Sequence, residues 1–374
     1  RLLMGAGGVL VVLIVAAVFA PLIATLPAGS QRSDARWRLG KALDEAGRWR
    51  EAVELWTDAL AETDDLALRS QIHGSAAVTA LYTDSIERAT ALAEAGVDEA
   101  ERSSDPRALC RALAVRAFLL AMHGDTAYGE VMDRALAIEA TLGEALGEWS
   151  PSAIAAECAR HAGDIDAALQ HYRAVLDRAT SAGDANVEQW AAFGLAWTEI
   201  VAGDLKAASE LADLVLDIAD QTQVMWIPAR SLRALVDAWL GDLASARALV
   251  DEAIQRATSA DERAHRFVAL GVLGTIEAFA GDARKAAQAF HRCRELAGAL
   301  GFAHASALRT FLFEAEVAAA TGELDQARAA VAAFHATVGD DGPPWARPAL
   351  ARAQAAILVA EGDPRAAIAL LEPS

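Results

Sequence analysis

The sequence predicts an all-α protein, a superhelix of about nine helix-pair repeats over residues 31–374, preceded by one hydrophobic segment over residues 1–30. Three observations predict this fold. A short glycine motif returns about every 40 residues, an alanine follows it at a fixed distance, and the chain of 374 residues contains only 10 prolines. Alanine is the strongest helix former and proline the strongest helix breaker, so this composition favours helices throughout.

The repeat is marked by a glycine that follows a small or apolar stretch and precedes a charged residue. These glycines are Gly47, Gly124, Gly163, Gly203, Gly241, Gly281, Gly322 and Gly362. The interval between Gly47 and Gly124 leaves room for two periods, and Asp84 marks a degenerate unit between them. We expect each glycine to end the first helix of a pair, where the chain needs a positive φ.

The residues after the glycine predict how the two helices of a pair meet. The charged residue, usually Asp, is expected to cap the second helix. A small residue stands five positions after each turn, and we expect it where the two helices cross: Ala52, Ala89, Gly129, Ala168, Ala208, Ala246, Ala286, Ala327 and Ala367. A large apolar residue often follows four positions later and is expected to fill the next layer: Trp56, Tyr172, Val250, Phe290, Val331 and Leu371. Stacked pairs of this kind form a superhelix whose concave wall is the usual binding surface.

The N-terminal segment is long enough to cross a membrane, because Gly5 to Leu26 contains no charged residue. Three arginines follow it at positions 32, 36 and 38, and the positive-inside rule then places the repeats in the cytoplasm, anchored to the inner membrane. Two other interpretations remain open: a signal peptide cleaved near Ala24–Ala28, or a buried helix of a domain that has been cut. Because the chain opens with Arg1 and ends inside a repeat, we expect it to be part of a longer protein.

Charge and cysteine content narrow the class of partner. The formal net charge of −19 repels phosphate backbones and argues against direct nucleic-acid binding by this chain. Cys110, Cys158 and Cys293 are far apart and odd in number, which is neither a disulfide framework nor a zinc site. This cysteine usage favours a reducing, cytoplasmic setting.

Catalytic motifs are missing from the sequence. It contains no phosphate-binding G-x-x-x-x-G-K-[ST] loop, no H-E-x-x-H metal motif and no G-x-S-x-G nucleophile elbow. We therefore expect no catalytic residue, no metal and no cofactor.

Tryptophan supplies the candidate binding residues, since nine are present. Two of them lie seven residues apart on one face of a predicted first helix, and two more flank the next first helix with two arginines between them. Projected into the concave groove, they would form an aromatic and cationic patch suited to a sugar, a peptide or an acidic tail. The alternative is that they fill gaps between repeats. The candidates are Trp190, Trp197, Trp226, Arg230, Arg233 and Trp239.

Several stretches resemble one known group of bacterial proteins. They are Asp133–Glu139, Trp149–Pro151, Gly203–Ala212, Gly281–Ala287, Thr321–Arg328, Pro344–Arg347 and Glu361–Pro364. With their period of about 40 residues, they are similar to the tetratricopeptide-like C-terminal half of large ATP-binding LuxR-type transcriptional regulators, including the maltose-regulon activator type. The resemblance covers roughly residues 35–374. It implies a scaffold that receives a signal and relays it to an ATPase domain and a helix-turn-helix domain, neither of which this sequence contains.

The expected function is therefore that of a non-catalytic scaffold, which binds a protein or a small-molecule signal in its concave groove and relays it to attached domains. The alternative is a membrane-anchored adaptor that assembles other proteins. We also expect that the array can self-associate end to end, because its last unit is incomplete and leaves an apolar face exposed.

Overall fold

The computed structural model of the chain describes residues 21–45, 48–123, 125–142, 149–302, 305–339 and 346–372. All regular secondary structure in these ranges is helical. The helices are α2 (Ser30–Glu45), α3 (Trp49–Glu62), α4 (Leu66–Thr83), α5 (Ile86–Ser103), α6 (Pro106–His123), α7 (Tyr128–Leu142), α8 (Pro151–Ala162), α9 (Ile165–Ala182), α10 (Ala185–Ala202), α11 (Leu205–Thr222), α12 (Trp226–Leu240), α13 (Leu243–Ser259), α14 (Arg263–Phe279), α15 (Ala283–Leu300), α16 (Ala305–Ala320), α17 (Leu324–Val338), α18 (Ala346–Ala360) and α19 (Pro364–Leu371).

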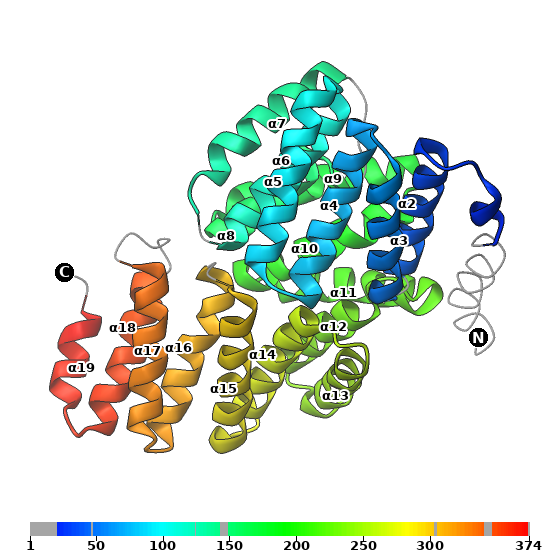
Figure 1. The fold of residues 1–374 in the computed structure, drawn as a ribbon. Helices are drawn as coiled ribbons and strands as arrows, with labels where there is room; N and C mark the ends of the chain where they lie inside the picture. The colour runs from blue at the N-terminus through cyan, green and yellow to red at the C-terminus, as the bar shows by residue number, and fades with distance from the viewer. Residues whose placement is uncertain are drawn as a thin grey trace.

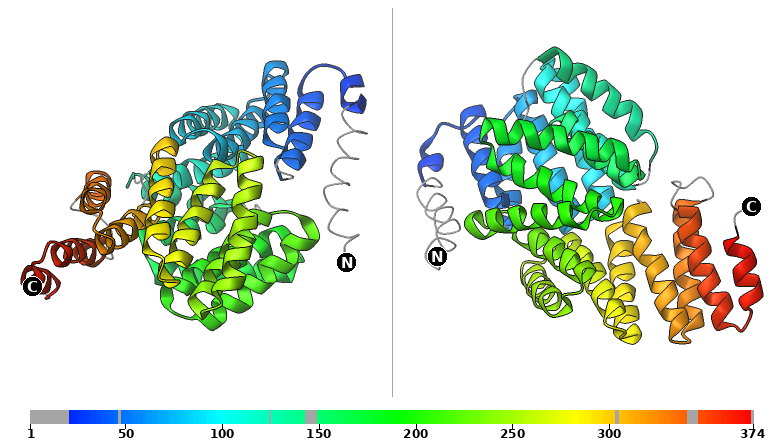
Figure 2. Two further views of the ribbon diagram at one scale, coloured as in Figure 1. Left: turned by 90° about the horizontal axis from the view of Figure 1, so that it is seen from below. Right: turned by 180° about the vertical axis from the view of Figure 1, so that it is seen from behind.

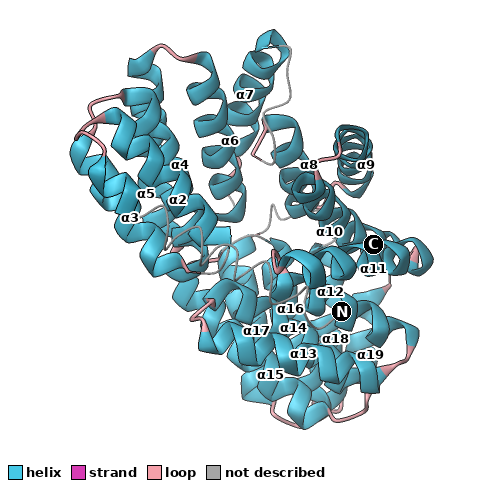
Figure 3. Cartoon of the chain, turned by 90° about the vertical axis from the view of Figure 1, so that its right-hand side faces the viewer, coloured by secondary structure: helices cyan, strands magenta, loops and turns pink. Residues whose placement is uncertain are grey.

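These helices pack as consecutive antiparallel pairs, α2 with α3, α4 with α5 and so on to α18 with α19 (Figure 1). We call the first, even-numbered helix of each pair the A helix and the second the B helix. The stacked pairs follow a curved path, which Figure 3 shows from one side. The last helices, α17 to α19, lie at one end of the array in Figures 1 and 2. The predicted all-α superhelix of helix pairs is confirmed.

The turns between A and B helices are built as the repeat motif predicts. Six of the predicted turn glycines have φ between 78° and 92°: Gly163, Gly203, Gly241, Gly281, Gly322 and Gly362. The next residue caps the B helix by accepting a main-chain N–H in five of these turns, through Asp164, Asp204, Asp242, Asp282 and Asp363. Glu323 makes no such side-chain hydrogen bond. The predicted turn residues Gly47 and Gly124 lie outside the described residues.

The small residue five positions after the turn is buried, as predicted, in all but one unit. Ala52, Ala89, Ala168, Ala208, Ala246, Ala286 and Ala327 have no exposed surface, and Ala367 has 3%. The prediction is wrong for Gly129, which is half-buried with open space where a Cβ would stand. Helix α7 buries Met132 and Ala135 instead, because its contacts fall further along the helix.

The large residues after the motif fill the core in most of the units that carry one. Trp56, Tyr172 and Phe290 are among the most deeply buried side chains. Their rings lie over glycines of neighbouring A helices. A Cβ added to Gly194 would stand 2.2 Å from a ring carbon of Tyr172. The prediction is wrong for Leu371, which is 53% exposed because α19 has no further helix of the described chain packed against it.

Neighbouring units are also joined by ion pairs between a B helix and the following A helix. Each pair links an arginine to a carboxylate side chain that is at most 6% exposed and therefore depends on its partner. These pairs are Arg173–Glu199, Arg247–Glu277 and Arg294–Glu314, at 2.7, 3.0 and 2.8 Å.

The superhelix closes on itself, which the sequence did not predict. The start of α14 lies against the turn between α4 and α5. Arg263 donates a hydrogen bond to the main-chain oxygen of Asp84 at 3.1 Å, and the ring of His265 lies 4.9 Å from that of Tyr82. The indole of Trp49 completes the contact, 6.2 Å from His265. We call these five residues the clasp.

A second contact supports the clasp, where the turn between α15 and α16 meets the start of α5. A Cβ added to Gly301 would stand 2.6 Å from the Glu87 carboxylate and 2.8 Å from Ile86. Leu81 of α4 and Leu270 of α14 belong to one continuous buried cluster, so the core crosses the contact. The clasp is therefore part of a packed interface between distant parts of the chain.

The N-terminal segment falls mostly outside the described residues, which begin at residue 21. The described part contributes Ile23, which is 8% exposed and packs with Leu39 and Trp56. Within the ranges that the structure describes, no helix is both long enough and apolar enough to span a membrane. The predicted anchor over residues 5–26 remains a prediction.

Candidate partner-binding surface

One position recurs at the C-terminal end of the A helices, two residues before the turn. Its occupants in successive units from α4 to α14 are Tyr82, Met122, His161, Val201, Trp239 and Phe279. Because each stands at the same place in its unit, these side chains follow one edge of the superhelix.

The first half of this edge is covered. Met122 and His161 are each 8% exposed, and Tyr82 is half-buried beneath His265 of the clasp. Here the edge forms part of the protein interior.

The second half of the edge is open to solvent. Val201, Trp239 and Phe279 are 45%, 48% and 43% exposed, and Leu240 beside Trp239 is 55% exposed. The rings of Trp239 and Phe279 meet edge to face, with centroids 4.9 Å apart. Helices α10, α12 and α14, which carry these residues, pack side by side. We call Val201, Trp239, Leu240 and Phe279 the open edge. Clustered exposed apolar side chains of this size are typical of interaction sites.

Carboxylates accompany the open edge on its B-helix side. Asp204 and Asp242 are exposed, and Asp282 is half-buried. Each of these aspartates stands three residues after an edge residue and caps the following B helix. Its Oδ1 accepts a main-chain N–H of that helix, at N–O distances of 2.9 to 3.1 Å. The surface thus combines aromatic rings with exposed negative charge.

A second row of carboxylates lies beneath the edge, two residues before its members. These groups are buried and each is held by an arginine, in the pairs Glu199–Arg173, Asp237–Arg233 and Glu277–Arg247. The paired arginines neutralise the charges of these buried carboxylates. The exposed aspartates therefore carry the negative charge of this surface.

The predicted tryptophan patch is divided by the structure. The guanidinium carbons of Arg230 and Arg256 lie 3.6 and 4.5 Å from the centroid of the Trp226 ring. Arg230 is in turn paired with Asp220 and Glu252. Cation–π and ion-pair contacts within the chain thus already engage Arg230, while Trp226 is half-buried.

The remaining candidates lie elsewhere. Arg233 binds Asp213 and Asp237. Trp239 stands thirteen residues after Trp226 in α12, which places the two indoles about 20 Å apart along the helix. Trp239 therefore belongs to the open edge and Trp226 to the other end of its helix.

Both tryptophans of α10 are half-buried. Trp190 packs against Tyr172 at 5.8 Å between ring centroids, and Trp197 against Phe193 at 6.3 Å. Whether these candidates bind a ligand stays a prediction. Sequence reasoning missed Val201, Leu240 and Phe279, although aligning the repeats on their glycines would have placed Val201 and Phe279 level with Trp239.

A buried ionisable cluster lies in α8. Burial alone would raise the pKa of the Glu157 carboxyl, but Arg160 and His161 outweigh it and hold that pKa well below the usual range. Burial lowers the pKa of His161, Arg160 lowers it further, and Glu157 offsets this only in part. A guanidinium nitrogen of Arg160 lies 3.1 Å from Nε2 of His161, where a neutral imidazole can accept its hydrogen bond. The cluster is a structural ion pair with a neutral histidine beside it.

The three cysteines are buried and unpaired with one another. Burial raises the pKa of Cys110 to about 11 and those of Cys158 and Cys293 to about 12, so all three are protonated thiols at neutral pH. No group of three His, Cys, Asp or Glu side chains in the described part of the chain could hold a metal ion.

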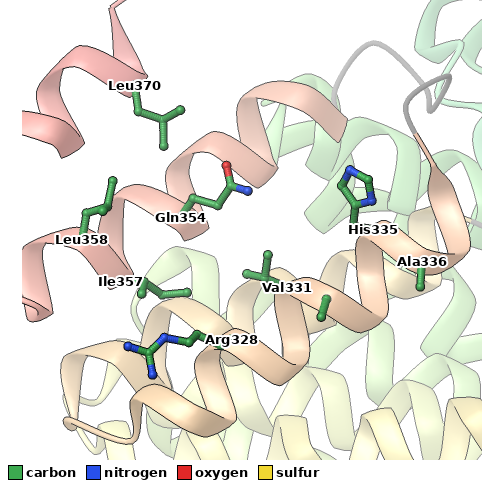
Figure 4. A pocket seen from close by; sticks show the side chains of 9 residues that line it. Arg328, Val331, His335, Ala336, Gln354, Ile357, Leu358 and Leu370 are labelled. Atoms are coloured by element: carbon green, nitrogen blue, oxygen red, sulfur yellow. The ribbon is translucent and has the colours of Figure 1, made fainter.

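A shallow apolar groove of about 670 Å³ lies between α17, α18 and α19 (Figure 4). Its floor includes Val331, Ile357 and Leu358, with Leu370 on the α19 side. Arg328 at its margin is paired with Glu361. Among the residues that the structure describes, none covers this groove.

Comparison with known proteins identifies the fold. No family model and no curated protein matches the chain. Among solved structures, a Rap protein complexed with Competence and Sporulation Factor matches 82% of this chain and 87% of its own, with 13% identity and a TM-score of 0.62. The APC/C hetero-tetramer Cut9–Hcn1 matches 92% of this chain and 73% of its own, with 11% identity and a TM-score of 0.54. A signal-transduction ATPase with a tetratricopeptide-repeat sensor from Pyrococcus horikoshii matches at 14% identity and a TM-score of 0.42, over 71% of this chain and 42% of its own. The chain thus has the predicted tetratricopeptide-like fold.

Proposed function

We propose that this chain is a non-catalytic tetratricopeptide-like scaffold that binds a protein partner and relays that binding event to domains attached to it. The observation that carries the proposal is the open edge. A soluble helical array normally buries rings such as Trp239 and Phe279, and here they stand exposed and in contact beside exposed carboxylates.

The architecture supports this proposal. A superhelix presents a long edge on rigid helices, so side chains far apart in the sequence can contact one partner together. The buried carboxylates of Glu199 and Glu277 pair with arginines of the same chain. They hold the edge in place and are not available to a partner. Two proteins of similar fold are seen in complexes, one with a signalling factor and one within a hetero-tetramer, which agrees with partner binding. The relay to attached domains follows from the resemblance to the sensor half of LuxR-type regulators.

Affinity purification from the source cells tests the proposal. The wild-type chain is compared with an edge variant, Trp239→Ala with Phe279→Ala. The control is Val359→Ala with Ile368→Ala, which removes two residues that are 56% and 59% exposed on α18 and α19. We expect a protein to be recovered in stoichiometric amount with the wild type and the control and to be lost with the edge variant. Recovery of no protein with the wild type contradicts the proposal.

A further inference from the structure

The clasp shows how this superhelix accepts a helix at its edge. Tyr82 presents a ring at the end of α4, and the first turn of α14 approaches it. Within that turn, His265 stacks on Tyr82, while Arg263 donates to the carbonyl oxygen of Asp84. The start of α14 therefore contributes an arginine and, two residues later, a ring. The end of α4 contributes the aromatic ring and the main-chain oxygen of the turn that follows it.

The open edge repeats the receiving half of that contact. Trp239 stands two residues before Gly241, as Tyr82 stands two residues before Asp84. Gly241 follows α12 and Asp84 follows α4 as the residue that ends the A helix. The edge runs from one site to the other along the same ends of α4, α6, α8, α10, α12 and α14. The open edge thus occupies, in later units, the position at which the clasp already receives a helix in an earlier unit.

The charge of the open edge indicates which helix would fit. Asp204 and Asp242 are exposed beside Val201 and Trp239, where the clasp has Ser85 after Asp84. Both carboxylates accept main-chain N–H groups of their own helices and keep their negative charge. An arginine in the first turn of an incoming helix would meet this charge as well as the turn carbonyl.

We propose that the open edge docks the first turn of an α-helix from a partner protein, in which an arginine precedes an aromatic or imidazole ring by two residues. The proposal rests on the proposed function as a scaffold and names the kind of partner. The ring packs on Trp239 and Phe279, and the arginine binds at the turn of α12, as Arg263 does at the turn of α4.

The chain itself supplies a probe for this site. A synthetic peptide of residues 260–274, helix-stapled on its far face and labelled with fluorescein at its C-terminus, carries Arg263 and His265 in their native spacing. Its binding to the full chain is measured by fluorescence anisotropy at two salt concentrations. We expect saturable binding that the double replacement Trp239→Ala and Phe279→Ala weakens at least tenfold. The control Val359→Ala with Ile368→Ala should leave the affinity unchanged.

Two further variants locate the contact. Trp239→Lys keeps a long side chain and adds a charge that repels the arginine of the peptide. It should weaken peptide binding as strongly as the double alanine replacement, and it tests the site even if the alanine variant is unstable. Peptide carrying Arg263→Ala should bind more weakly and lose most of its salt dependence. Tyr82→Ala should leave peptide binding intact, because the clasp is already occupied by α14.

The outcomes separate the partner class from the proposed function. Equal affinity of the wild type and the edge variants overturns the proposal, as does an absence of saturable binding. Self-association of the chain that depends on Trp239, without peptide binding, also overturns it in favour of a second copy as the occupant. If affinity purification still recovers a protein through the open edge, the scaffold function stands and only the helix-start partner is wrong.

Discussion

Arg263 at the start of α14 donates a hydrogen bond to the main-chain oxygen of Asp84, 3.1 Å away and 179 residues earlier in the chain. An extended solenoid contacts only its neighbouring units, so this bond means that the superhelix has completed a turn. The clasp covers Tyr82, the first residue of the A-helix edge, whereas Trp239 and Phe279 at its other end stay open to solvent.

The clasp can be tested at Gly301, which has φ 73° and faces Ile86 and Glu87 across the interface. Gly301→Ala adds a Cβ that would stand 2.8 Å from Ile86. We expect this substitution to lower the free energy of unfolding in urea, because the added methyl group overpacks the interface. The loss should be about 1–3 kcal/mol larger than that of a Gly→Ala substitution at a positive-φ glycine with open space around it.

Gly281 is the matched control, with φ 78° and open space where a Cβ would stand. Gly281→Ala therefore carries the same backbone strain without the clash. Equal losses for Gly301→Ala and Gly281→Ala would mean that the two parts of the chain do not touch in solution.

The close packing of Tyr172 over α10 predicts an unusual response to alanine. Gly→Ala inside a helix normally stabilises a protein by about 0.5–1 kcal/mol. We expect that gain for Gly298→Ala in α15, where a Cβ meets open space. Gly194→Ala should instead lose about 1–3 kcal/mol, because its Cβ would overlap the fully buried Tyr172 ring. Thermal unfolding of the two variants against wild type decides the matter, and a stabilised Gly194→Ala would contradict the packing.

The buried cluster in α8 predicts how stability depends on pH. The pKa of His161 is lowered in the fold, so below its ordinary value of about 6.5 the unfolded chain binds more protons than the folded one. The free energy of unfolding must then fall as the pH falls below about 6.5. The pKa of Glu157 is also lowered, which adds a second loss below about pH 4.5.

His161→Gln removes the first of these two windows while keeping a neutral polar side chain. Urea unfolding between pH 5 and 7 should show a flatter dependence for this variant than for wild type. His171→Gln, at an exposed position on α9, is the control and should keep the wild-type slope. An unchanged slope in His161→Gln would show that His161 does not titrate in this range.

The helices and their turns could be predicted from the sequence because the repeat carries local physical requirements. Gly203 must adopt a positive φ, Asp204 must cap α11, and Ala208 must fit where two helices cross, and each requirement selects its residue type. The units that departed from the pattern departed locally too. Gly129 lacks the helix crossing that would bury it, and Leu371 has no further helix of the described residues packed against it.

The clasp and the open edge could not be predicted in the same way, because both depend on how tightly the superhelix winds. That winding sums small rotations at every unit boundary, and no single residue encodes it. Tyr82 and Trp239 occupy equivalent positions in their units, yet one is covered by His265 and the other is 48% exposed. The tryptophan content singled out Trp226 and Trp239 in α12, but packing between units places Trp226 against Arg230, at the other end of the helix from Trp239.

Hydroxyl-radical footprinting by mass spectrometry is the most direct test of the account, because it reads both halves of the edge in one sample. Oxidation rates are normalised to those of the urea-unfolded chain. In the free protein, Trp239 and Phe279, which are 48% and 43% exposed, should react at a substantial fraction of their unfolded rates while Met122 is strongly protected. A bound partner should protect Trp239 and Phe279. Equal protection of Met122 and Trp239 in the free protein, or a partner that binds without protecting Trp239, would contradict it.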